Sequence, residues 1–355
     1  QDAVARDKKS PGKFDTDLLL KIENKFENEL GIFPSIRMPE GDESRRNDPF
    51  GITHTHHFYT KRNLICLSEF WKQANSEELP PRIRHLLSFW MTSIIDRNAV
   101  IRNRFVVNRH NPYGRINGPM QNTLYCPDLF CEVNIIDLLR DKLNDITSGF
   151  RKKRFLSTAI STGSSEILSI PDNSIDYIFV DPPFGHNIWY SELNFITEAW
   201  LRVRTNNNRE GVVNNSQKKG LSEYQEILEK CFTEYYRILK PGRWITTEFH
   251  NSKNSVWIAI QEAIRKAGFV IANVSTLDKI QGTIHQDTSA GSVKQDLIIS
   301  AYKPDKKLED QFRLTAGTEE GCWEFVRAHL EKLPNLVLRD GVIEVVAERM
   351  NYMLF

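Results

Sequence analysis

Residues 175–185 read Ile-Asp-Tyr-Ile-Phe-Val-Asp-Pro-Pro-Phe-Gly, a short apolar run that ends abruptly in an acidic, proline-rich turn. A run of this length and composition is typical of a buried strand in a parallel sheet. The carboxyl ends of such strands border the crevice in which open α/β sheets bind ligands. The stretch therefore predicts a parallel strand over 175–180, with a ligand site in the turn that follows it.

The segments after this strand alternate in a way that favours an α/β sheet. A helix is predicted to begin near Ser222, which with Gln225 forms a capping box, and to stop at residues 240–242. The other predicted elements are strands at 155–160 (marginal), 243–249, 269–276 and 296–302 and a helix at 255–267. We therefore expect a Rossmann-like, doubly wound α/β sheet, interrupted by a polar and mobile insertion at 206–220.

The whole chain divides into three predicted regions. Residues 1–150 are expected to be mainly helical, residues 151–304 hold the sheet, and residues 305–355 are a helical C-terminal extension. The predicted helices outside the sheet region are 14–30, 61–74 with Thr60 as N-cap, 81–95, 134–143, 320–333 and 343–354. Residues 108–127 are rich in Asn, Gly and Pro and are expected to be irregular.

The composition is that of a globular protein, with 40% hydrophobic and 26% charged residues among 355. No run approaches the ~20 apolar residues that span a bilayer, and no signal-peptide pattern opens the chain. Five scattered cysteines without a C-x-x-C pattern argue against a disulfide framework or a zinc knuckle. We therefore expect a cytoplasmic protein that does not contact a membrane.

The charge is nearly balanced overall but unevenly distributed. The net charge is 47 − 46 = +1, whereas the stretch from Arg82 to Arg115 holds seven arginines and one acidic residue, Asp96. A basic segment of this kind can contact a phosphate backbone, or it can form an ordinary solvated face. The charge alone does not decide between these two interpretations.

The turn after the strand suits recognition of an exocyclic amine. Pro182 and Pro183 lack N–H donors and hold the turn extended, so nearby carbonyl groups are left as acceptors. A carbonyl together with the Asp181 carboxylate can accept both hydrogens of an amine, while the Phe184 ring can stack on a planar base. Such hydrogen bonds favour the pyramidal amine, which can attack an electrophilic methyl group. A turn without chemistry is the alternative to this catalytic interpretation of residues 181–184.

The same stretch resembles the amino-methyltransferases that use S-adenosylmethionine to methylate adenine N6 or cytosine N4 in DNA. The resemblance rests on DPPFGHNIWYSELNFITEAWL, YRILKPG, LDKIQGTIHQDTSAGSVKQDLIISAYKP and, nearer the N-terminus, MPEGDESRRNDPFGITHTHHFYTKRNL. It covers roughly residues 35–305 and points to a bacterial subgroup often linked to restriction and phage defence. The resemblance implies a double-stranded DNA substrate, a flipped base and a restriction or defence subunit as a partner. Asp at the first motif position favours adenine N6 within this family.

Several further residues are candidates for binding. The candidates for substrate contact are Asn187, Tyr190, Ser191, Glu192, Arg209, Lys218 and Lys219, and those for cofactor contact are Asp181, Tyr59 and Thr60. Ser191 and Glu192 could equally begin a helix, and Thr60 could cap one. The histidines of THTHH at 53–57 lack the companions of a known metal motif, so no metal is expected.

The glycine-rich turn that binds the cofactor in this family is not found in the sequence. None of the 18 glycines is separated from another by a single residue, so the G-x-G turn that the resemblance requires is missing. We expect the cofactor half of the sheet to lie upstream of Gln1, and this chain alone to bind S-adenosylmethionine weakly or not at all. Two other functions stay open, an RNA N-methyltransferase and a catalytically silent DNA-binding or specificity component that retains the fold.

Overall fold

The computed structural model describes residues 12–28, 32–109, 111–152, 157–186, 188–250, 253–277, 296–305, 318–332, 336–339 and 342–345. The chain divides into two compact units. Unit 1 consists of Gln1–Ser161, Ile188–Glu210 and Asn214–Lys218, and unit 2 of Thr162–Asn187, Gly211–Val213 and Lys219–Phe355. Residues 188–210 thus belong to unit 1, although they follow directly on the turn at 181–185.

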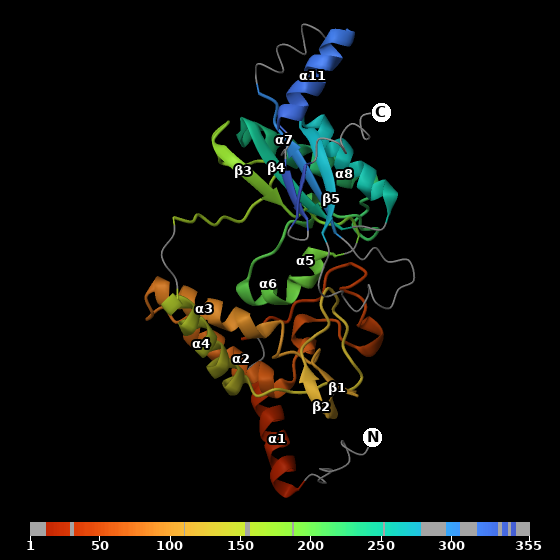
Figure 1. Cartoon of the computed structure of the whole chain (residues 1–355). Helices are drawn as coiled ribbons and strands as arrows, with labels where there is room; N and C mark the ends of the chain where they lie inside the picture. The colour runs from red at the N-terminus through yellow and green to blue at the C-terminus, as the bar shows by residue number, and fades with distance from the viewer. Residues whose placement is uncertain are drawn as a thin grey trace. The chain divides into compact units, whose positions relative to one another are not determined.

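Unit 1 is mainly helical (Figure 1). Its helices are α1 (Lys13–Asn28), α2 (Lys61–Ala74), α3 (Pro81–Ile95), α4 (Ile135–Lys152), α5 (Tyr190–Leu193) and α6 (Phe195–Leu201), with short 3₁₀ turns at Asp48–Phe50, Thr55–Phe58 and Asn207–Arg209. Helix α2 begins where predicted, because the Thr60 hydroxyl oxygen accepts a hydrogen bond from the Asn63 N–H at 3.2 Å. These helices share one hydrophobic core, whose buried residues include Leu64 of α2, Met91 of α3 and Trp200 of α6.

The first two strands form a hairpin where an irregular segment was predicted. Strands β1 (Arg104–Asn108) and β2 (Asn111–Asn117) pair antiparallel, with Phe105 opposite Ile116. The prediction was therefore wrong for Asn108 and for residues 111–117. Gly114 has φ +77° and lies so close to the Phe105 ring that an added Cβ would be 2.2 Å from its Cζ atom. A glycine that looks like a loop signal in the sequence thus makes room for a cross-strand aromatic ring.

Unit 2 contains a four-stranded mixed sheet, which confirms the α/β class. Its strands are β3 (Ile175–Val180), β4 (Leu239–Phe249), β5 (Val270–Leu277) and β6 (Asp296–Tyr302), in the order β3-β4-β6-β5. Strands β3 and β4 are parallel, whereas β6 runs antiparallel to both of its neighbours. The prediction of a marginal strand at 155–160 was wrong for residues 157–160, which have no regular structure. Residues 155–156 lie outside the described part.

Two helices, α7 (Leu221–Ile238) and α8 (Asn254–Lys266), pack on the sheet and bury Phe232, Ile245 and Ile264 in a common core (Figure 1). Helix α7 is capped by Gly220, whose N–H donates to Glu223 at 2.9 Å, and not by the predicted pair Ser222 and Gln225. The prediction of a buried β3 was also wrong, because β3 is an edge strand and its Tyr177 and Phe179 are each 55% exposed.

The described C-terminal residues contain both a helix and strands. The predicted helix at 320–333 is confirmed as α11 (Glu319–Lys332), and β7 (Leu336–Arg339) and β8 (Val342–Val345) pair antiparallel. The helix predicted over 343–354 was therefore wrong for residues 343–345, and its remaining residues lie outside the described part. Across the described ranges, no helix combines the length and apolarity that crossing a membrane would take.

Candidate functional site

The turn at 181–185 lies at the carboxyl end of β3. Val180, the last residue of β3, is paired with Thr247 of the parallel strand β4. Asp181 is exposed, while Pro182, Pro183 and Phe184 are half-buried. Gly185 has φ +72°, a left-handed conformation that glycine adopts without steric cost and that ends the extended proline stretch. Asp181 is thus accessible at a strand end of the type that borders ligand sites in α/β sheets.

Two backbone carbonyls of the turn are already hydrogen-bonded within unit 2. The hydroxyl of Tyr224, which is fully buried on α7, donates to the Pro183 carbonyl at 2.6 Å. The Val213 N–H donates to the Gly185 carbonyl at 3.1 Å. These two bonds fix the path of the turn, and the carbonyl of Pro182 is the candidate for a second acceptor beside the Asp181 carboxylate.

The Phe184 ring is held against the end of β4. It meets the buried Phe249 ring edge to face, with centroids 5.5 Å apart, and lies 6.1 Å from the His250 ring. His250 in turn has its Nδ1 atom 2.7 Å from Oδ1 of the buried Asp296. Neither His250 nor Asp296 was predicted from the sequence. His250 directly follows the strand next to β3, which is the signal that could have identified it.

Ser191 and Glu192 are buried on α5 in unit 1. The Ser191 N–H and hydroxyl both donate to Glu210, at 2.9 and 2.5 Å. Glu192 accepts three hydrogen bonds, from the N–H groups of Glu43 and Ser44 at 2.9 and 2.8 Å and from Asn214 Nδ2 at 2.9 Å. These contacts give both side chains structural roles. Their predicted contact with substrate, like that of the 40% exposed Tyr190, stays a prediction, and Asn187 lies outside the described residues.

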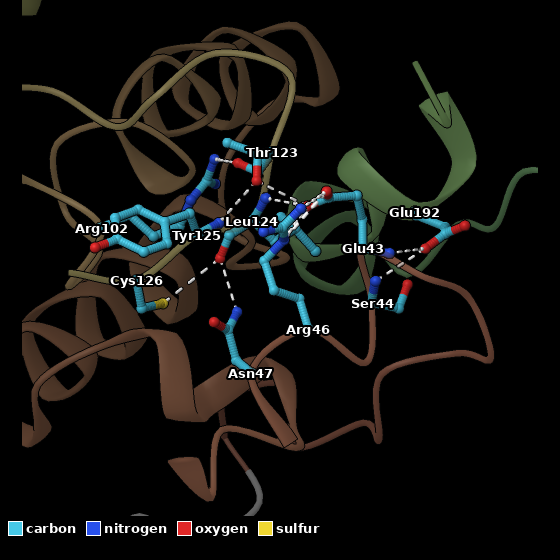
Figure 2. A network of polar contacts seen from close by, with 10 residues as sticks. All are labelled: Glu43, Ser44, Arg46, Asn47, Arg102, Thr123, Leu124, Tyr125, Cys126 and Glu192. Atoms are coloured by element: carbon cyan, nitrogen blue, oxygen red, sulfur yellow. Dashed lines mark hydrogen bonds and ion pairs between the residues drawn. The ribbon is translucent and has the colours of Figure 1, made fainter. Parts of the chain in front are cut away.

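Glu43 extends this polar network through unit 1 (Figure 2). Its Oε2 atom accepts from the Thr123 hydroxyl at 2.9 Å and from the Leu124 N–H at 2.8 Å, and its carboxylate also pairs with Arg46. Burial raises the pKa of Glu43, but the Arg46 guanidinium and the two other donors outweigh burial and hold it below its usual value. Glu43 was not predicted from the sequence, because GDES at 41–44 carries no local sign of the residues that Glu43 contacts.

The polar insertion at 206–220 contributes buried as well as exposed residues. Asn214 is 1% exposed and Lys219 is 7% exposed. Arg209 and Lys218 are exposed, as a phosphate contact requires, and Lys218 has φ +55°. The described structure therefore suits the predicted DNA contact better at Arg209 and Lys218 than at Lys219.

A family model matches the part of the chain that contains the turn at 181–185. Residues 175–337 match the DNA methylase family model. The match begins at the first residue of β3 and includes the turn at 181–185, β4, α8, β6 and α11. It confirms the resemblance inferred from the sequence over these residues, whereas the resembling segment at 38–64 precedes the match. No curated protein matches the chain.

The methylase match is accompanied by distant likenesses to solved structures. TTHA0409 of Thermus thermophilus, described as a candidate DNA modification methylase, is 15% identical with a TM-score of 0.24, over 41% of this chain and 53% of that chain. Its complex with S-adenosyl-L-methionine matches over 42% and 59%, at the same identity and TM-score. A chain of the Haloferax volcanii complex of a methyltransferase with the Trm112 activator is 12% identical, with a TM-score of 0.26, over 45% and 67%. This chain thus spans about half the length of TTHA0409, and similarity at this level assigns neither fold nor function.

Tyr59 and Thr60, the predicted cofactor contacts, precede the methylase match and have structural partners. The buried Tyr59 hydroxyl donates to the Ile95 carbonyl at 2.8 Å and accepts from Trp200 Nε1 at 3.0 Å. The Thr60 hydroxyl caps α2 and also contacts Glu132. Burial raises the pKa of Tyr59 far above its usual value, with Asp96 adding to the shift. Cofactor contact by these two residues stays a prediction.

His54, His56 and His57 form a compact cluster in unit 1, with the His56 and His57 ring centroids 4.3 Å apart. Burial, with smaller contributions from the charges of His57 and His54, lowers the pKa of His56 to about 4. No group of three or more His, Cys, Asp or Glu residues in the described ranges is arranged to hold a metal ion. The lowered pKa of His56 links this cluster to the pH dependence of stability.

We expect the His56 imidazole to make unit 1 less stable as the pH falls from 7 to 5. The unfolded chain takes up a proton near the ordinary pKa of about 6.5, whereas the folded state resists protonation until about pH 4, so acid favours unfolding. Because His56 is partly exposed, solvent reduces this effect. Between pH 7 and pH 5, the free energy of unfolding of His56→Gln should therefore fall by about 1 kcal/mol less than that of the wild type. Urea unfolding at both pH values measures the difference, with exposed His85→Gln as control. Equal losses in wild type and His56→Gln would contradict the prediction.

Proposed function

We propose that this chain is the catalytic part of an S-adenosylmethionine-dependent DNA methyltransferase that modifies the exocyclic amine of a flipped base, preferentially adenine N6. The observation that carries the proposal is the exposed Asp181 in its proline turn at the carboxyl end of β3, inside the stretch that matches the DNA methylase family. Double-stranded DNA is the proposed substrate. A bacterial source and a restriction or defence partner are proposals that rest on the sequence resemblance alone. A cytoplasmic location is a proposal that rests on the composition and the cysteine pattern.

The turn supplies three contacts for the base. The Asp181 carboxylate accepts one hydrogen of the amine, and the carbonyl of Pro182 accepts the other, because the carbonyls of Pro183 and Gly185 are already hydrogen-bonded. Phe184 offers its ring to the base plane, and its edge-to-face contact with Phe249 keeps that ring from turning away. Two acceptors and one stacking surface together fix the orientation of the amine.

The methyl donor is supported by the family match but not by a binding site in the described residues. S-adenosylmethionine supplies the electrophilic methyl group that an amine attacks. Its adenosine and carboxylate groups are bound in α/β sheets by a close-approaching glycine turn, and no two of the 18 glycines of this chain have G-x-G spacing. We therefore assign no residue here to hold the donor.

The test is methyl transfer by the full-length protein to unmethylated DNA and, in parallel, to RNA. Tritiated methyl groups from S-adenosylmethionine should enter the DNA, and mass spectrometry of the digested DNA should find N6-methyladenine. N4-methylcytosine would overturn the choice of base, and incorporation into RNA alone would overturn the choice of polymer. No incorporation into either, with DNA binding retained, would favour a catalytically silent component.

A further inference from the structure

Three arginines of the basic segment, Arg102, Arg109 and Arg115, differ in their exposure and contacts. Arg102 is 5% exposed, with Nη1 2.7 Å from Asp96 Oδ1 and Nη2 donating to the Thr123 carbonyl at 2.6 Å. Arg109 and Arg115, on the β1–β2 hairpin, are exposed. Neither has an ion pair with a carboxylate in the described part of unit 1. Of these three arginines, Arg109 and Arg115 are the ones available to a phosphate backbone.

The hairpin is anchored at its base and exposed beyond it. Next to the buried Arg102, Asn103 is 1% exposed and its Nδ2 donates to the Asn98 carbonyl at 2.6 Å. The Asn103 carbonyl accepts from the Cys131 N–H at 3.2 Å. Farther along the hairpin, Val107 and Ile116 are 48% and 52% exposed. An isolated two-stranded ribbon is only marginally stable by itself, so this anchoring is what allows an exposed arm.

The charge of the arm selects its partner. From Arg104 to Asn117 the hairpin contains three arginines and no acidic residue. Apart from one bridge between Arg104 and Phe130 at its base, the ribbon pairs with no other strand in the described residues. A strand of the length of β2, 7 residues, reaches about 24 Å, and the major groove of about 12 Å admits a two-stranded ribbon.

We propose that the β1–β2 hairpin is a DNA-binding arm that enters the major groove of the substrate duplex, with Arg109 and Arg115 on the phosphates at its rims. The exposed side chains of Val107 and Ile116 then face the groove, where thymine methyl groups provide apolar contacts. The choice of duplex DNA as the occupant rests on the proposed function. The arm itself does not depend on methyl transfer.

The experiment measures duplex binding by the full-length protein against salt concentration, by fluorescence anisotropy. Removal of two phosphate contacts in Arg109→Ala/Arg115→Ala should reduce the slope of log K against log salt by about two units, at about 0.9 per contact. The matched control is Arg140→Ala/Lys142→Ala, which removes two basic residues from α4 of the same unit and should leave the slope unchanged. Equal salt slopes in the wild type and the hairpin variant would contradict the proposal that the hairpin binds DNA.

Two further measurements separate groove binding from misfolding of the hairpin. Arg109→Lys/Arg115→Lys keeps the charges and should restore the slope, whereas a folding defect would not be rescued. Methyl green, which occupies the major groove, should compete with the wild type, and netropsin, which occupies the minor groove, should not; the reverse order would overturn the groove assignment. If the wild type binds DNA with the expected salt slope but transfers no methyl groups, the proposed function is refuted, whereas the proposed DNA-binding arm is still supported.

Discussion

Asp181→Ala should abolish methyl transfer by the full-length protein while its fold and its DNA binding persist. The carboxylate is the acceptor that holds the reacting amine, and loss of a positioned hydrogen-bonding or proton-accepting group typically lowers the rate by roughly 10²–10⁴. Asp181 is exposed at the end of β3, and substitutions at exposed positions rarely change stability much, so the melting temperature should stay close to that of the wild type. Tritium incorporation into DNA measures the rate, and anisotropy measures the binding.

Asp176→Ala is the matched control for this substitution. Asp176 lies on β3, the strand that Asp181 follows. Its side chain is 62% exposed, and its carboxylate pairs with Lys240 at 2.9 Å near the opposite end of β3. A surface ion pair contributes little to stability, so this variant should retain wild-type activity. Near wild-type transfer by Asp181→Ala would show that the turn at 181–185 does not hold the amine.

The elements that the sequence could predict are those whose determinants are local. The start of α2 follows from an N-cap at Thr60, and both the cap and the bounds Lys61–Ala74 are found as predicted. The turn after β3 follows from the abrupt change at Val180–Asp181. The cap of α7 was misplaced because Ser222 and Gln225 have the capping spacing, yet Gly220 and Glu223 have the same spacing and meet in the structure.

The buried polar contacts could not be predicted, because their partners are far apart in the sequence. Glu192 meets the backbone of Glu43 across 149 positions, and His250 meets Asp296 only once β4 and β6 have paired. The β1–β2 hairpin was missed for a different reason, because its local sequence is misleading. Its Asn-Pro-Tyr-Gly stretch has loop composition, and only the packing of Phe105 on Gly114 shows that the glycine belongs to a strand.

Glu192→Ala should destabilise unit 1 by about 3–5 kcal/mol, because it removes the acceptor of three buried donors. Glu192 is 1% exposed, and Asn214 and Ser44 are equally buried, so water cannot replace the lost hydrogen bonds without entering the core. The backbone is shaped around this carboxylate, since a Cβ added at Gly41 would lie 2.2 Å from the Glu192 Cδ atom. Gly41→Ala should therefore also destabilise the unit, by forcing the carboxylate away from its donors.

Urea unfolding followed by fluorescence measures the loss, and Asp145→Ala is the control within the same unit. Asp145 also bears a carboxylate and pairs with Lys142 at 2.9 Å, but its side chain is 68% exposed, so its removal should cost under about 0.5 kcal/mol. Glu192→Gln should fall between the two, because one amide oxygen can still accept while the amide N–H₂ faces donors. A loss for Glu192→Ala as small as that for Asp145→Ala would mean that the Glu43 and Ser44 N–H groups find other acceptors, and that the loop at 41–47 does not depend on α5.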